Sequence, residues 1–283
     1  MSGSVKASLW TIWFIMTVFF ITAFDQYAFS QIAGNEKEIL SLFVLAAIAA
    51  AFPIHYRGYS FVLFQWVSLA SFLLYGLLIE IIVTQFALLF SLLLMKINRE
   101  SLYRIPLNSI MFYITSLSAA GVYYFVAGLP LPNALEFFVP LAAYVCTFLF
   151  VNHVLIFLIR NHLAKIKTKF IDRGTLWELA TAALVLPMSL ILVMMYQEIG
   201  YGASGIVAVA FIGISIMLKV YRRSELMNEQ LKKVNELGIE LSSTWEVKET
   251  AHLFINKIKD LFPSDYIYLY TIENTRLELL EAY

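Results

Sequence analysis

The fold is decided by residues 60–95, SFVLFQWVSLASFLLYGLLIEIIVTQFALLFSLLLM. As one helix, these 36 residues would be about 54 Å long at a rise of 1.5 Å per residue. The hydrocarbon core of a bilayer is only about 30 Å thick. We therefore expect two short membrane-spanning helices here, with a turn near Gly76 to Glu80.

The whole chain has the composition of a membrane protein rather than of a cytosolic enzyme. Of its 283 residues, 60% are hydrophobic and 14% are charged, and its mean hydropathy is +0.77. Soluble domains have about 25% charged residues. We expect eight spans of membrane-crossing length, at residues 7–24, 39–54, 60–78, 81–95, 105–127, 134–159, 175–196 and 201–220. The predicted fold class is an all-α polytopic membrane bundle over residues 1–220.

The basic residues predict the orientation of this bundle. Lys and Arg in short loops stay on the cytoplasmic side of a membrane. With eight spans and a cytoplasmic N-terminus, 13 basic residues of the first 223 lie inside and only Lys37 lies outside. The prediction is a multi-pass protein of the bacterial inner membrane with both termini in the cytoplasm. The single cysteine, Cys146, lies within an apolar block, so we expect a small core residue and neither a disulfide nor a cysteine metal site.

After the last span, residues 221–242 are polar and free of proline, which predicts a helix that continues from the membrane into water. Apolar positions along it alternate four and three residues apart, which is the spacing of a coiled coil. This seam predicts a signalling helix that pairs in a homodimer, and an amphipathic helix lying on its own following domain is the alternative. The apolar seam residues are Val220, Met227, Leu231, Val234 and Leu241.

Residues 243–283 predict a water-facing α/β segment. Ser243 and Glu246 have the spacing of a capping box, and an apolar helical face runs from there to Pro263. The stretch YIYLYTI at 266–272 predicts a strand, ENT a turn, and RLELLEA a second strand.

The run from Leu237 to Tyr283 resembles the opening of a GAF domain, on its helix spacing followed by two strands and a tight turn. A multi-span bundle, a signalling helix and a GAF start in this order are similar to the N-terminal half of bacterial membrane sensor proteins. Such proteins end in a diguanylate cyclase, an HD-GYP phosphodiesterase or a histidine kinase. The resemblance covers about a third of a GAF domain, so we expect the chain to be part of a longer protein.

Candidate chemistry is sparse. We find no catalytic motif and no metal-ligand pattern, and we expect no cofactor and no nucleic acid partner. Polar residues within spans are the default place to look for function. The candidate signal-sensing residues are Glu80, Thr84, Gln85, Asn152 and His153. Glu80 at the outer end of its helix could bind a cation or read protons, and the alternative is a residue that only marks the outer boundary of the span.

These observations lead to one functional hypothesis and two alternatives. The hypothesis is a membrane-embedded module that detects a small-molecule or membrane-derived signal and controls a C-terminal output domain, with cyclic-di-GMP synthesis favoured by the resemblance. Its expected partners are the lipid bilayer, that signal and a second copy of the chain. The alternatives are the input module of a histidine kinase and a small-substrate transporter with a regulatory tail.

Overall fold

The computed structural model describes most of the chain in two compact units, residues 1–215 and 216–283. The described residues are 3–56, 59–61, 64–95, 98, 101–130, 132, 136–163, 169–171, 173–243, 247–261, 266–273 and 276–282.

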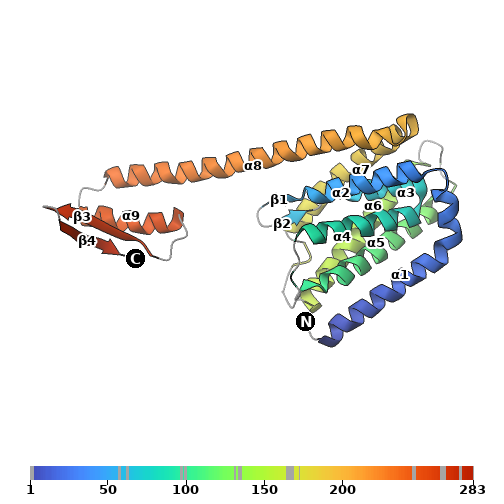
Figure 1. Ribbon diagram of the computed structural model, residues 1–283, viewed down its shortest axis with the longest axis horizontal. Coiled ribbons are helices and arrows are strands. Elements are labelled where there is room, and N and C mark those ends of the chain that lie inside the picture. Colours follow the sequence, from blue (N-terminus) through green and yellow to red (C-terminus); the bar gives the residue numbers. More distant parts are fainter. Residues whose placement is uncertain are drawn as a thin grey trace. The chain divides into compact units, whose positions relative to one another are not determined.

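The first unit is a helical bundle, and the described helices fall where the apolar blocks predict spans (Figure 1). Their bounds are α1 Gly3–Ile32, α2 Glu36–Ala51, α3 Gln65–Tyr75, α4 Leu77–Leu94, α5 Arg104–Ala127, α6 Phe138–Leu158, α7 Arg173–Ile199 and α8 Gly202–Ser243. A π-helical turn, Ile159–Leu163, extends α6.

Five helices among the described residues are long and apolar enough to cross a membrane, which is compatible with a membrane protein. They are α1, α4, α5, α6 with its extension, and α8. The helices α2 and α3 have 16 and 11 residues, and among the described residues α7 contributes a shorter apolar segment, Ala183–Ile199. The eight-span topology therefore stays a prediction.

Residues 60–95 form two helices, as expected, and the turn between them is Gly76 alone. Gly76 has φ 81° and ψ −175°, a conformation that is essentially restricted to glycine. The predicted span 60–78 begins too early, because Tyr59–Phe61 is a strand, β2, which pairs antiparallel with β1, Ile54–Tyr56. The strand has only three residues, Tyr, Ser and Phe. A hydrophobic pattern over three residues is too short to distinguish a strand from the start of a helix.

The centre of the bundle lies on α2, α3 and α4. Leu42, Trp66 and Ile79 are among its most deeply buried side chains. The helix α1 contacts α5 and α4 and leaves most of its described apolar side chains exposed. The expectation for Cys146 is wrong, because this side chain is exposed on α6 and faces out of the bundle core.

The second unit contains the end of α8, the helix α9 (Val247–Leu261) and the strands β3 (Tyr268–Glu273) and β4 (Arg276–Ala282). The strands pair antiparallel, with Tyr268 opposite Ala282 and a register shift between Leu269 and Tyr270. The predicted order of helix, strand and strand is confirmed. Ala251 and Ile255 of α9 are buried, and α9 packs on both strands. The predicted capping box lies outside the described residues because Glu246 is not described.

The helix α8 is continuous over its 42 residues, which confirms that the last apolar block continues into the polar segment (Figure 1). At 1.5 Å per residue it is about 63 Å long, roughly twice the thickness of a bilayer core.

Candidate ligand-binding site

Glu80 lies in the first turn of α4 and is completely buried. Its burial shows that it packs between helices and is not exposed in the turn that precedes α4. Its Oε1 atom accepts hydrogen bonds from the hydroxyls of Ser68 (2.6 Å), Thr84 (3.0 Å) and Ser116 (2.9 Å). Three helices, α3, α4 and α5, therefore meet at one carboxylate oxygen.

The α3–α4 turn explains why these residues come together. Ser68 and Thr84 each lie eight residues from Gly76, so a helical hairpin that turns at Gly76 places them opposite each other. Their hydroxyl oxygens are 2.6 Å apart. Thr84 is also one helical turn from Glu80, on the same face of α4. Ser116 completes the cluster from α5.

The cluster provides hydrogen-bond donors but, among the described residues, no basic partner for the Glu80 carboxylate, and complete burial disfavours its charged form. Three hydroxyl donors and the N-terminal end of the α4 helix dipole stabilise an ionised carboxylate. Among the described residues, no Lys, Arg or His forms a salt bridge with Glu80 within 4.0 Å. Its second oxygen, Oε2, is buried and has no hydrogen-bond partner there.

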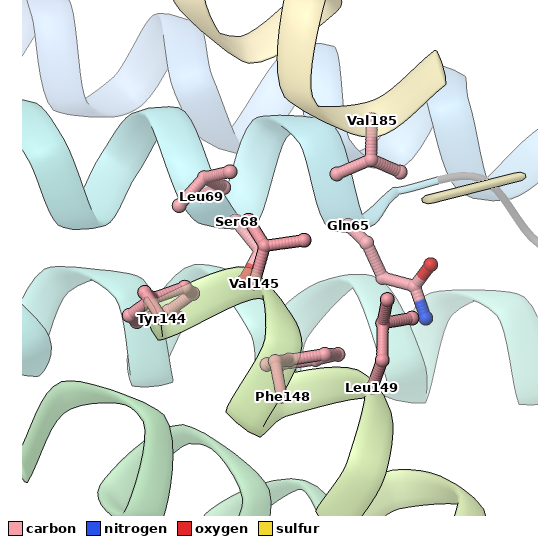
Figure 2. A pocket seen from close by; sticks show the side chains of 8 residues that line it. All are labelled: Gln65, Ser68, Leu69, Tyr144, Val145, Phe148, Leu149 and Val185. Atoms are coloured by element: carbon pink, nitrogen blue, oxygen red, sulfur yellow. The ribbon is translucent and has the colours of Figure 1, made fainter. Parts of the chain in front are cut away.

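A pocket opens next to the cluster, between α3, α6 and α7 (Figure 2). Its cavity volume is about 30 Å³, within about 360 Å³ of space between atoms that includes open solvent. Ser68 lies in its wall and is thereby shared between the pocket and the Glu80 cluster. The lining residues are Gln65, Ser68, Leu69, Tyr144, Val145, Phe148, Leu149 and Val185. A mostly apolar pocket with a few polar groups is the usual form of a small-molecule site.

The aromatic side of the pocket comes from α6. The Tyr144 ring stacks on Phe148, at 6.2 Å between ring centroids, and on Phe72 of α3, at 4.6 Å. The Tyr144 hydroxyl is buried and has no hydrogen-bond partner among the described residues. The wall of the pocket therefore contains Tyr144 and Ser68, and the Ser68 hydroxyl is hydrogen-bonded to a buried carboxylate.

The structure distributes the sequence-predicted polar residues over several places. Glu80 and Thr84 belong to one cluster, whereas the Gln85 side-chain amide donates to the carbonyl oxygen of Ser109 on α5 at 3.3 Å. Asn152 is buried on α6, and its Oδ1 has no partner among the described residues. His153 Nε2 lies 2.6 Å from the carbonyl oxygen of Phe170, outside the pocket.

A second hydroxyl cluster lies where α7 passes into α8. The Tyr196 hydroxyl, in the last turn of α7, is hydrogen-bonded to Ser41 of α2 and to Ser204 in the first turn of α8. The Ser204 hydroxyl also donates to Ser41 at 3.2 Å. Gly200 makes the turn between the helices with φ 59°, a left-handed conformation that favours glycine.

The seam predicted on the signalling helix is exposed where its side chains are described. Val220, Met227, Leu231 and Val234 are between 49% and 62% exposed. The side chain of Leu241 lies outside the described residues.

Sequence reasoning missed Ser68, Ser116 and Tyr144. Serine and tyrosine are common inside membrane helices, so nothing singled these three out in the chain itself. The symmetric spacing of Ser68 and Thr84 about Gly76 is the one signal that could have found part of the cluster. Ser116 and Tyr144 are brought in only by the packing of α5 and α6.

Within the described part of the chain, no group of three or more His, Cys, Asp and Glu side chains could hold a metal ion. The fold and the site define the class as an apolar helical bundle with an internal carboxylate and pocket, followed by a small α/β unit. Searches for resemblance find no matching protein-family model, no matching curated protein and no matching solved structure.

Proposed function

We propose that this chain is a membrane-embedded sensing module, in which a small molecule entering the pocket between α3, α6 and α7 changes the packing of α8. The observation that carries the proposal is the contact between Trp66 of α3 and Phe211 of α8, whose ring centroids are 5.5 Å apart. Trp66 is completely buried and stands between the pocket-lining residues Gln65 and Ser68 in the chain.

A second connection supports the same coupling. Val185 of the pocket lies on α7, and α7 joins α8 through only Gly200 and Tyr201. The hydroxyl cluster around Tyr196 ties this junction to α2. A ligand that displaces α3 or α7 would thus act on the N-terminal end of α8. A continuous helix can transmit such a displacement over a long distance.

The exposed apolar seam on α8 supports a homodimer, in which the paired α8 helices would receive the change in packing from the bundle. Exposed apolar side chains at heptad spacing gain from pairing with a second copy. A change in register or rotation of the paired helices would then reach α9 and the hairpin. Both termini lie on the cytoplasmic side of the bacterial inner membrane in this proposal, on the strength of the basic loops. The resemblance to GAF-linked sensors favours cyclic-di-GMP synthesis as the controlled output and a histidine kinase as the next candidate.

Cysteine cross-linking of the full chain in lipid vesicles tests the coupling. Cys146 is first replaced by serine, and a single cysteine is then placed at Met227 on the seam or at Glu229 on another face of α8. We expect Met227→Cys to cross-link between copies several times faster than Glu229→Cys. A bulky residue in the pocket, Val145→Phe, should change the Met227 rate. Equal rates at both positions, unaffected by Val145→Phe, would contradict the proposal.

A small-substrate transporter is a second candidate, and the burial of Glu80 favours it. Ionisable groups inside membrane bundles often mark a substrate or ion path. Saturable uptake of a substrate into vesicles that contain the purified chain, abolished by Glu80→Gln, would place transport ahead of sensing.

A further inference from the structure

We infer that the pocket beside Glu80 binds a small lipophilic amine in its protonated form, with the ammonium group at the Ser68 and Tyr144 hydroxyls and the apolar body along α6 and α7. This inference rests on the proposed function and adds the chemical class of the ligand. Its first ground is the carboxylate itself. A buried charge is strongly unfavourable unless it is paired, and Glu80 has no basic partner among the described residues.

The second ground is the arrangement of oxygens around the end of the pocket. Ser68 lies in the pocket wall and its Oγ is 2.6 Å from Glu80 Oε1, so a group that touches Ser68 also lies close to the carboxylate. Tyr144 lines the same pocket, and its hydroxyl oxygen is buried and unpartnered in the described structure. An ammonium can donate to a hydroxyl oxygen beside the carboxylate, whereas a carboxylate or phosphate head would be repelled by an ionised Glu80.

The third ground is the rest of the wall. The Phe148 ring in the wall suits a cation, because the quadrupole of an aromatic ring attracts positive charge. Val145, Leu149 and Val185 provide an apolar surface from two helices (Figure 2). The pocket thus combines a polar end beside a carboxylate with apolar walls. This arrangement is complementary to a short alkyl or aryl amine.

Three probes with the same six-carbon body test this inference: hexylamine, hexanol and hexanoate. Binding to the purified full chain in lipid nanodiscs is followed by the fluorescence of Trp66, with Trp66→Phe as the blank. We expect saturable binding of hexylamine about tenfold or more tighter than hexanol, with hexanoate weakest. Hexanol binding as tightly as hexylamine, or no saturable binding of any probe, would overturn the inference.

Substitutions test which residues cause the preference for hexylamine. Glu80→Gln should remove the preference for hexylamine over hexanol, and saturable hexanol binding shows that the variant is folded. Val145→Phe should weaken both probes, whereas Cys146→Phe adds the same ring at the next residue, on the exposed face, and should weaken neither. If Glu80→Gln does not fold, the order of the three probes on the unchanged chain decides alone. The cross-linking of α8 is measured without any amine. A wrong ligand class would therefore change only the binding results, and a wrong sensing function would change only the cross-linking results.

Discussion

The Ser68 hydroxyl donates to Glu80 Oε1 across the α3–α4 hairpin, at 2.6 Å, and both side chains are buried. This bond connects the wall of the pocket to the only carboxylate described within the bundle core. Any group that binds at Ser68 therefore changes the environment of Glu80. The pair is thus the point at which ligand binding and the packing of three helices are joined.

Ser68→Ala should lower the free energy of unfolding by about 1–2 kcal/mol, the cost of removing a hydrogen bond between helices in a membrane protein. The matched control is Ser71→Ala on the same helix. Ser71 is equally buried, but its hydroxyl donates to the carbonyl oxygen of Val67 in its own helix, so little should be lost. Unfolding in mixed micelles of rising denaturing-detergent content measures both. Equal losses would mean that the Glu80 bond contributes nothing beyond burial.

Gly76→Ala should destabilise the hairpin, because φ 81° with ψ −175° is strained for any residue with a Cβ. The expected cost is about 1–3 kcal/mol. Gly121→Ala in α5 is the control, since a Cβ there meets nothing within 4 Å and alanine favours a helix. The melting temperature should fall only for Gly76→Ala, and a similar fall for Gly121→Ala would show general intolerance of alanine.

Much of the bundle follows from the hydrophobic pattern, because long apolar blocks bounded by polar turns have few alternatives to a helix. The pattern predicts α4 to α8 to within a few residues. It misses the β1–β2 pair, since three-residue strands carry no readable period. It places Glu80 at the start of a helix correctly but does not predict its burial, because the hydroxyls that bond it come partly from two other helices.

The candidate site, like the fold, could be predicted only in part from the sequence. Glu80 and Thr84 could be picked out as polar residues one helical turn apart, but the pocket could not, because its lining combines α3, α6 and α7. Asn152 and His153 look equivalent in the chain as neighbours on one predicted span. In the structure one is buried and the other contacts Phe170, a difference that depends on which face of α6 packs inward.

Tyr196→Phe should loosen the junction between α7 and α8. The variant keeps the ring and removes the hydroxyl that bonds Ser41 and Ser204, which we expect to cost about 1–3 kcal/mol. Amide hydrogen exchange should become faster at the start of α8, while exchange in α5 stays unchanged. Tyr201→Phe removes a hydroxyl from an exposed ring nearby and should change neither. Unchanged exchange in Tyr196→Phe would show that the hydroxyl cluster does not hold the junction.

Ile255→Ala should open the α/β unit while leaving the membrane bundle folded. Ile255 is buried where α9 packs on β3 and β4, and truncating a buried isoleucine costs about 2–5 kcal/mol. A unit with one helix and a two-stranded sheet has little stability to lose, so exchange of the β3 and β4 amides should rise toward that of an unfolded chain. Asn256→Ala changes the exposed neighbour and should leave the exchange unaltered. Protected β3 and β4 amides in Ile255→Ala would mean that the hairpin is held by contacts other than its packing on α9.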